Sequence, residues 1–342
     1  PEPAERIAAA QVLGEVGLGS FYQPLVPLLR DPDSRVQRAA LLQAGRLRNR
    51  KLWPLVLDTL DSPRLWRAAA ATLVAAGTPV VPQLIAASER EGRSPEVQAR
   101  LIEICGRIGG QRATAWLKGQ LSHPDAGIRS HIVHALHRCD YQAQAEEAAL
   151  VQQQIQVEVA RSAETLAILK DIGNDGAVQL LRQALDETLA QNRERIFFLL
   201  SFLCDRRAIL QACENLALPS AEKRAYALEV IDVLIPRALK GMVFPLLTDL
   251  PPGQKGQQLW ALFPQPQQDR LQRLREIIAG PAGRFNPWTQ ACALYAAGEL
   301  SATAVSETAA AAHFAPEPLV RETAAWTLSK LDGPAYRDQI LA

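Results

Sequence analysis

The chain has 342 residues, 48% of them hydrophobic and 21% charged, with a formal net charge of +1. This hydrophobic content is enough to bury a large core, and it excludes global disorder, which goes with low hydrophobicity and high net charge. The near balance of 37 basic and 36 acidic residues argues against general nucleic-acid binding. The five cysteines are odd in number and form no Cys-x-x-Cys, so they indicate neither a disulfide framework nor a zinc module. A reducing compartment is the simplest interpretation.

The chain begins at Pro1 and its single methionine is Met242, so we expect it to be excised from a longer protein. No signal peptide is expected, because no charged n-region and apolar h-region precede the first pattern. Residues 68–88 carry no charge and are long enough on paper to cross a membrane. We expect no span there, since helix breakers such as Gly77 and Pro82 interrupt the stretch and it falls in phase with a repeat.

Prolines recur along the chain at intervals of 29 to 32 residues, at Pro3, Pro32, Pro63, Pro95 and Pro124, and again at Pro287 and Pro316. Most of these prolines are followed by an aliphatic residue and then often by an arginine. An alanine-rich apolar face comes next. Proline suits the first turn of a helix, and Asp31, Ser62, Ser94 and their polar neighbours can cap the helices that follow. Glycine tolerates the backbone conformation that ends a helix. The expected helix ends are Gly17, Gly77, Gly109, Gly298 and Gly333.

Partner helices are expected, in chain order, over residues 22–29, 52–60, 80–87 and 114–121. No single helical pair can bury its apolar stripe, so the pairs must stack into a solenoid. Further along, the pattern predicts a long helix within 141–172, a turn at 173–176, helical pairs in 177–250, a turn at 251–256 and a loop at 280–287. The predicted fold is an all-α solenoid of about ten stacked hairpins in a right-handed superhelix.

The repeat units resemble HEAT-like repeats, specifically the compact class shared with phycobilin lyases. The residues that carry this resemblance run from Pro32 through Arg35 and Val36 to Ala40, with echoes at 63–77, 124–136 and 316–328. The resemblance covers residues 1–140 and 286–332 and implies an armadillo-type, α-solenoid fold. It says little about function, because such arrays serve many roles.

The centre of the chain is similar to the soluble HEAT region of large bacterial proteins with an ATP/ADP-carrier-like or major-facilitator membrane domain. The runs 193–200, 207–209, 223–236 and 239–247 carry this resemblance. We therefore expect three segments in one continuous solenoid: N-terminal HEAT-like repeats (1–140), irregular central helical repeats (141–285) and C-terminal HEAT-like repeats (286–342). The chain itself contains no transporter helices, so any transport function implied belongs to sequence outside it.

Signatures of catalysis are absent: the chain has no GxxxxGK[ST], no GxGxxG after a strand, no HExxH and no GxSxG. We therefore expect neither an enzyme nor a cofactor site. Four of the five histidines fall within fifteen residues, and His131 and His134 lie one helical turn apart. They are weak candidates for metal ligands, because a metal needs a further converging partner and no acidic residue lies between them. Cys204 and Cys213 lie among apolar residues and are expected to be small core residues.

Two clusters are candidates for contact with a partner protein. The first comprises Arg35, Arg38, Trp66, Arg67 and Arg100, because tryptophan and arginine are favoured in binding hot spots. The second is a basic turn between helices, formed by Arg46, Arg48, Arg50 and Lys51, for which a solvated loop is the simpler interpretation. Residues 1–140 carry 18 Lys and Arg against 13 Asp and Glu, whereas residues 141–342 carry 19 against 23.

The predicted function is a non-catalytic protein-interaction scaffold that binds protein partners through a concave groove. No nucleic-acid partner is expected, and the sequence identifies no small-molecule substrate. From the central resemblance we expect the cytoplasmic regulatory HEAT region of a bacterial transporter-like membrane protein, at the inner face of the membrane. A phycobilin lyase-like or chaperone-like subunit acting on a phycobiliprotein, and a free cytosolic adaptor, are the alternatives.

Overall fold

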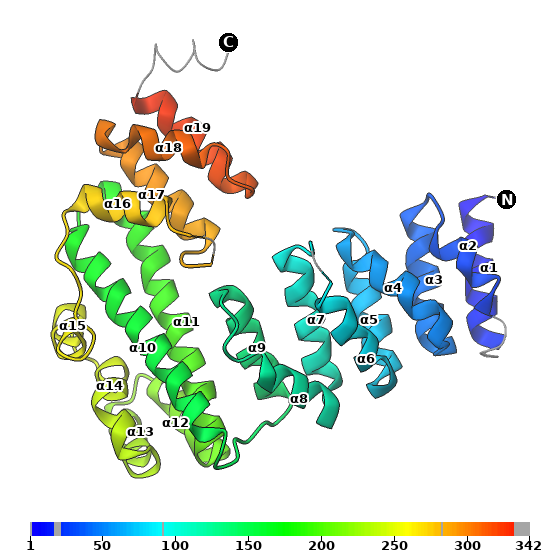
Figure 1. Cartoon of the computed structure of the whole chain (residues 1–342), viewed down its shortest axis with the longest axis horizontal. Coiled ribbons are helices and arrows are strands. Elements are labelled where there is room, and N and C mark those ends of the chain that lie inside the picture. The colour runs from blue at the N-terminus through cyan, green and yellow to red at the C-terminus, as the bar shows by residue number, and fades with distance from the viewer. Residues whose placement is uncertain (1, 17–21, 91, 282, 332–342) are drawn as a thin grey trace. The chain divides into compact units, whose positions relative to one another are not determined.

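The computed structural model describes residues 2–16, 22–90, 92–281 and 283–331 (Figure 1). Within these ranges the chain forms nineteen α-helices and short 3-10 turns, and no β-strand. The all-helical fold predicted from the sequence is confirmed. The chain divides into two compact units, which are described separately: unit 1 comprises residues 1–124 and 128–141, and unit 2 comprises residues 125–127 and 142–342.

Unit 1 is built from short helices whose bounds follow the predicted repeat. They are α1 (Pro3–Val16), α2 (Leu25–Leu29), α3 (Ser34–Leu47), α4 (Trp53–Asp58), α5 (Trp66–Ala76), α6 (Val81–Ser88), α7 (Pro95–Ile108), α8 (Gln111–Gly119) and α9 (Ala126–Arg138). The four partner helices predicted from the sequence correspond to α2, α4, α6 and α8, with ends displaced by one to three residues.

The longer helices of unit 1 pack on one another in chain order, α1 on α3, α3 on α5 and α5 on α7, with the shorter helices joining them. At the α7–α9 junction Gly106 faces Ala135 so closely that an added Cβ would lie 2.6 Å from the Ala135 Cβ atom. A side chain there would force the helix backbones apart, so glycine sets this spacing. The expected helix ends at Gly77 and Gly109 are confirmed, since both have positive φ and follow α5 and α7 directly.

Two of the three predicted helix caps differ in the structure. Ser94 caps α7 as predicted, accepting from the Val97 N–H. The cap of α3 is Asp33, because Asp31 is taken by a bidentate ion pair with Arg6 and also accepts from the Asp33 N–H. Ser62 caps no helix, because a turn precedes α5 and the residue before that helix is Leu65.

The threonine at one repeat position ties neighbouring helices together. The Thr72 hydroxyl on α5 donates to the Leu41 carbonyl of α3 at 2.7 Å and contacts its own Ala68 carbonyl at 2.9 Å. In unit 2, Thr327 makes the same pair of contacts with the Leu294 and Thr323 carbonyls. These hydroxyl contacts are therefore part of the repeat, although the proline spacing alone gives no sign of them.

Replacing this hydroxyl by a methyl group keeps the side-chain shape and removes the contact between helices. We expect Thr72→Val and Thr327→Val each to lower the free energy of unfolding by about 1 kcal/mol, the net value of one intramolecular hydrogen bond. Urea unfolding followed by circular dichroism measures this loss. Thr323→Val is the matched control, because its hydroxyl bonds only within its own helix. A loss from Thr72→Val no larger than that of this control would contradict the role assigned to the contact.

The described part of unit 2 contains ten helices, of which the first two are the longest. They are α10 (Ala148–Asp171), α11 (Gln179–Leu203), α12 (Arg206–Leu216), α13 (Ala221–Leu234), α14 (Arg237–Leu247), α15 (Pro252–Trp260), α16 (Arg270–Ile278), α17 (Pro287–Glu299), α18 (Ser306–Ala312) and α19 (Pro318–Leu331). Helix α10 packs along α11 and also contacts α14, α15 and α16, while α17 packs on α11, α16 and α19. The apolar ends of α10 and α11 join α16 to α19 in one core, which includes Ile168, Leu181, Leu294 and Val320.

The sequence misplaced two features of unit 2. Residues 251–256, predicted to be a turn, mostly belong to α15, whose Trp260 indole N–H donates to the Ala163 carbonyl of α10 at 3.0 Å. Gly298 does not end a helix, because α17 continues to Glu299 and an added Cβ on Gly298 would lie 2.6 Å from the Trp326 ring. The other two expected helix ends, Gly17 and Gly333, lie outside the described residues.

The cysteines are dispersed and unpaired. Cys105 and Cys292 are buried, and burial raises the pKa of the Cys105 thiol to about 12 and that of Cys292 to about 11. Cys204 and Cys213, predicted to be core residues, are only half-buried. Burial also raises their pKa values, which keeps both thiols protonated and weakly nucleophilic at neutral pH.

Among the described helices, none taken singly has the length and apolar character needed to cross a membrane. Residues 66–76 and 78–88 meet those criteria only as a pair, bent by 108° at the break.

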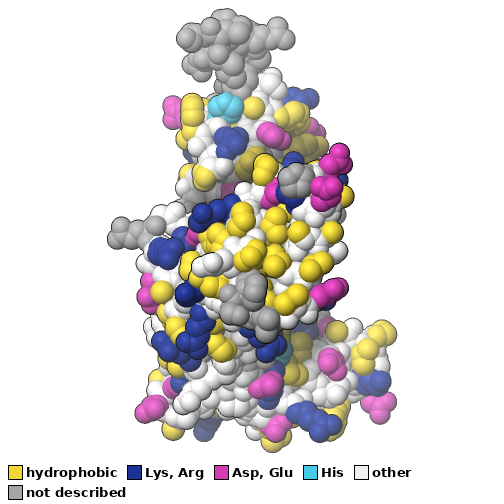
Figure 2. All heavy atoms as spheres, turned by 90° about the vertical axis from the view of Figure 1, so that its right-hand side faces the viewer, with side chains coloured by type: hydrophobic (Ala, Val, Ile, Leu, Met, Phe, Trp, Pro, Cys, Tyr) yellow, Lys and Arg dark blue, Asp and Glu magenta, His cyan; other side chains and the backbone are white. Residues whose placement is uncertain are grey.

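Apolar side chains also gather on the outer face of α1, which is at the front of Figure 2. Val12 and Val16 of this helix are about half exposed.

Candidate interaction groove on unit 1

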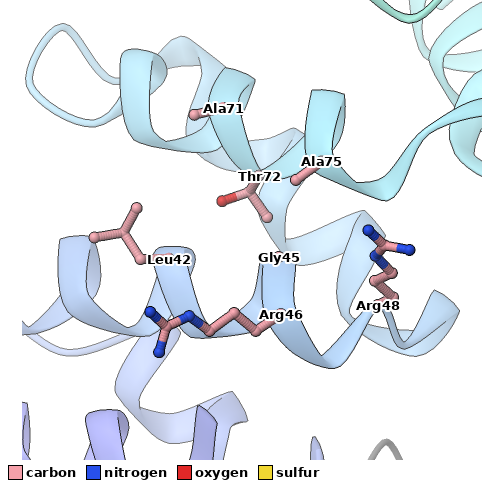
Figure 3. A pocket seen from close by; sticks show the side chains of 7 residues that line it. All are labelled: Leu42, Gly45, Arg46, Arg48, Ala71, Thr72 and Ala75. Atoms are coloured by element: carbon pink, nitrogen blue, oxygen red, sulfur yellow. The ribbon is translucent and has the colours of Figure 1, made fainter. Parts of the chain in front are cut away.

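A hollow of about 490 Å³ lies between the C-terminal halves of α3 and α5. We call it the α3–α5 groove, and it is lined by Leu42, Gly45, Arg46, Arg48, Ala71, Thr72 and Ala75 (Figure 3). Leu42 is 52% exposed, so the groove opens to solvent. An opening of this kind suits a polypeptide segment lying across it, because small-molecule sites usually enclose most of the ligand.

The helical periodicity of α3 and α5 determines which side chains face this groove. On α3 the exposed positions three or four residues apart are Arg35, Arg38, Leu42 and Arg46. On α5 they are Arg67, Ala71 and Ala75. The opposite faces, with Val36, Ala40, Ala69 and Leu73, are buried in the core of unit 1. Since residues at this spacing share one side of a helix, the groove continues the face that carries Arg35, Arg38 and Arg67.

The floor of the groove offers few polar groups. Gly45 has no side chain, and a Cβ there would lie 3.4 Å from the Thr72 Cα atom. The Thr72 hydroxyl is already occupied by the carbonyls of Leu41 and Ala68. The α5 wall is made of alanine methyl groups (Figure 3). Among the described residues that line the groove, Arg46 and Arg48 carry the only charged side chains.

The structure divides the basic turn into two pairs. The Arg50 guanidinium lies 5.9 Å from the Trp53 ring centroid, and the Lys51 ammonium lies 5.2 Å from that of Tyr22, so both cations rest on aromatic rings. Arg46 and Arg48 line the groove instead, and neither guanidinium has a hydrogen bond or ion pair with another described residue. The basic turn therefore contributes two of its four cations to a surface open to a partner.

Arg48 has an unusual backbone conformation. It follows α3 as its C-cap with φ 47° and ψ 30°, the left-handed region that glycine or asparagine normally occupies at a helix end. For an L-residue with a Cβ atom this conformation costs about 1 kcal/mol or more, because Cβ comes close to the following carbonyl oxygen. The cap N–H still donates to the Ala44 carbonyl at 3.1 Å, which holds the Arg48 side chain at the edge of the groove.

The five residues predicted to contact a partner differ in their surroundings. Arg35 is held by Asp33, and its hydrogen bonds lower the pKa of that carboxyl to about 2. Arg38 donates to the Arg64 carbonyl at 3.4 Å. Trp66 lies between two cations, with Arg67 at 5.4 Å and Arg100 at 4.8 Å from its ring centroid. Arg100 also donates to the Leu60 carbonyl at 2.5 Å, so it ties α7 to the preceding repeat.

The two histidine candidates both lie on α9. The His134 Nδ1 atom is 2.7 Å from the Ser130 carbonyl oxygen of its own helix. Among the described side chains, no group of three or more His, Cys, Asp or Glu is placed to hold a metal ion. The structure thus brings no third protein ligand to His131 and His134.

The sequence analysis missed Leu42, Gly45, Ala71, Thr72 and Ala75 as members of a site. One local signal was present, because Leu42 falls at helical spacing between Arg38 and Arg46 on an otherwise polar face. The alanines gave no such signal, since small residues on a repeat helix also mark close helix packing. The groove exists because α3 and α5 pack together. This packing cannot be predicted from the sequence of either helix alone.

Comparison with known proteins finds a family model that is similar to part of the chain. Residues 1–77 and 81–159 match the family model described as HEAT repeats. No curated protein matches the chain. A crystal structure of an engineered protein aligns over 97% of this chain and 96% of its own, with 14% identity and a TM-score of 0.28. HEAT repeats typically act as scaffolds or interaction modules, and in general without catalysis. The described part of the chain is thus all-helical, and residues 1–77 and 81–159 match the model for HEAT repeats.

Proposed function

We propose that this chain is a non-catalytic interaction scaffold that binds a protein partner through the α3–α5 groove. The observation that carries the proposal is a solvent-open groove with an apolar wall and two arginines that have no partner among the described residues. Apolar surface and arginine are the features enriched in protein interfaces. The neighbouring Arg38 and Arg67 extend the same face of α3 and α5.

A photo-crosslinking residue placed in the groove tests this proposal. The full chain would carry p-benzoylphenylalanine at Ala71 and be irradiated in a lysate of its source cells. Position 71 is expected to give a discrete cross-linked species that disappears when Arg46→Glu and Arg48→Glu are added. Ala115 on α8 is the matched control, because it is also an exposed alanine on a helix of unit 1. Equal cross-linking from positions 71 and 115, or cross-linking indifferent to the arginines, would contradict the groove.

The cellular setting proposed for the scaffold is the cytoplasmic face of a bacterial transporter-like membrane protein. Its support is the resemblance of the central runs within residues 193–247 and the basic excess of residues 1–140, which suits an anionic membrane leaflet. An antibody to this chain, used on fractionated source cells, tests the setting. A band well above 37.4 kDa in the membrane pellet is expected. A soluble band near that mass would overturn the proposed membrane setting and leave the adaptor and lyase-like alternatives. Of these two, only the lyase-like alternative requires bilin transfer.

A further inference from the structure

The charge of the α3–α5 groove is one-sided. Its lining contains two arginines and no aspartate or glutamate. On α5 the next charged residue before Ala71 is Arg67, and no charged residue follows it until Glu89. Both walls of the groove are therefore either positive or neutral, so a basic segment would meet repulsion there and an acidic one attraction.

Many other arginines among the described residues are already engaged. Carboxylates hold Arg6, Arg35, Arg195 and Arg273, and backbone carbonyls hold Arg100, Arg129, Arg182 and Arg275. Arg46 and Arg48 lack such partners among the described residues. In addition, Arg48 occupies a left-handed backbone position that would suit glycine better. The two guanidinium groups are thus available to carboxylates supplied from outside the chain.

The two arginines do not converge on one point. Their side chains leave the end of α3 in different directions, Arg46 toward the side of Leu42 and Arg48 away from it (Figure 3). In these orientations the two guanidinium groups do not face one another, so an extended ligand suits them better than one compact anion. An extended segment with several carboxylates could pair with each in turn, and arginine binds a carboxylate with two parallel hydrogen bonds.

The apolar wall adds a second requirement. Leu42 is 52% exposed, and the methyl groups of Ala71 and Ala75 face the same hollow. Gly45 leaves room beside them, since an added Cβ would fill space next to Thr72 and Ala75. A side chain of leucine size would bury apolar surface against this wall, and that burial favours binding.

We infer that the α3–α5 groove binds an acidic peptide segment of a partner protein, with carboxylates on Arg46 and Arg48 and an aliphatic side chain against Leu42, Ala71 and Ala75. This inference rests on the proposed function, because it names the partner chemistry of the same groove. The excess of basic residues in 1–140, 18 against 13, attracts such a segment from a distance.

Fluorescein-labelled twelve-residue peptides, titrated into the full chain and followed by anisotropy, test the inference. One peptide alternates glutamate with leucine, a second replaces each glutamate by glutamine, and a third replaces each glutamate by lysine. The acidic peptide is expected to bind roughly tenfold or more tightly than the glutamine peptide, the effect of one charge-assisted hydrogen bond. Its binding should weaken as salt rises. Equal affinity for the acidic and glutamine peptides would overturn the inference.

Charge reversal within one turn supplies the matched control. Arg46→Glu with Arg48→Glu and Arg50→Glu with Lys51→Glu change the net charge equally, but only the first pair lines the groove. The first variant should lose binding of the acidic peptide by about tenfold or more, and the second should change it by less than about threefold. Equal losses would show a diffuse electrostatic effect and overturn the inference. A single-stranded oligonucleotide that binds as tightly as the acidic peptide, with the same dependence on Arg46 and Arg48, would overturn it as well.

Arg48→Gly separates loss of binding from loss of fold. Glycine adopts the φ of 47° without strain, so this variant should be at least as stable as the parent chain while it binds the acidic peptide less tightly. Unchanged binding with Arg48→Gly would remove Arg48 from the site. The photo-crosslinking of position 71 keeps the two proposals distinct. If the groove cross-links a partner but prefers the glutamine peptide, the proposed function stands and the inference of an acidic segment is refuted.

Discussion

Replacing Glu158 by alanine should lower the free energy of unfolding by about 3–5 kcal/mol, the cost of leaving one partner of a buried ion pair without the other. Glu158 on α10 accepts from the Arg195 Nε atom of α11 at 2.9 Å, and both side chains are less than one tenth exposed. Arg195 also donates to the side-chain amide oxygen Oδ1 of Asn192, and the Asn192 Nδ2 atom donates to the Ser162 hydroxyl at 3.3 Å. In the variant the guanidinium keeps its charge and its burial but loses its counterion.

The size of this loss comes from burial, and an exposed ion pair in the same chain provides the comparison. Glu103 and Arg138 are 3.7 Å apart and about half exposed. Glu103→Ala should therefore change the free energy of unfolding by less than about 1 kcal/mol. Urea unfolding measures both variants, and amide hydrogen exchange locates the weakened contacts in α10 and α11. Similar losses for Glu158→Ala and Glu103→Ala would contradict the account.

A double variant separates the ion pair from the packing around it. Glu158→Leu with Arg195→Met removes both charges and keeps most of the side-chain volume. It should recover much of the stability lost by Glu158→Ala, because apolar residues of similar volume often replace a buried pair without loss. The recovery should be incomplete, since Asn192 loses the donor that Arg195 supplies.

The sequence predicts the helices of unit 1 well because their signals are local. Proline at the first turn, a polar cap and a glycine at positive φ each act within a few residues, as at Ser94, Pro95 and Gly109. The prediction failed at residues 251–256, which were expected to form a turn and mostly belong to α15. Helix α15 begins in a segment with two prolines and two glycines, and its tie to the rest of unit 2 is the contact of Trp260 with Ala163, 97 residues away.

The candidate site was predictable only in part, for the same reason. The basic turn is visible in the sequence as four cations within six residues. Which of them stack on the rings of Tyr22 and Trp53, and which line the groove beside α5, depends on the folded structure. Exposure at Leu42 and left-handed φ at Arg48 are properties of the folded backbone. The buried partners Glu158 and Arg195 are 37 residues apart, so their pairing has no local signature.

The second large effect is expected at Arg273 on α16, whose side chain is 1% exposed. Its Nε atom donates to Asp171 at 3.0 Å, Nη1 to Glu276 at 2.8 Å and Nη2 to the Pro266 carbonyl at 2.9 Å. One planar guanidinium thereby joins the end of α10, its own helix and the segment that leads into it. Arg273→Met keeps most of the apolar stem but leaves the Asp171 carboxylate, itself mostly buried, without its cation.

We expect Arg273→Met to lower the free energy of unfolding by about 3–5 kcal/mol and to speed amide exchange in α16 and residues 261–269. Arg273→Lys should recover only part of the loss, because an ammonium cannot reproduce the three-way fork. Arg275→Met is the matched control on the same helix, since Arg275 is exposed and bonds only the Ala304 carbonyl. A loss from Arg275→Met as large as that from Arg273→Met would refute the anchoring role.

The same network gives unit 2 a defined response to acid. Burial opposes ionisation of Glu276, but hydrogen bonds from Arg284 and Arg273 outweigh it and hold the pKa of Glu276 below its ordinary value of 4.5. A carboxyl with a lowered pKa stabilises the fold fully above its unfolded pKa, and this stability is lost as pH falls through the folded value. The parent chain should therefore lose stability steadily below about pH 4.5. Arg273→Met should lose less stability over that range, because it lacks one of the two cations that lower the pKa of Glu276.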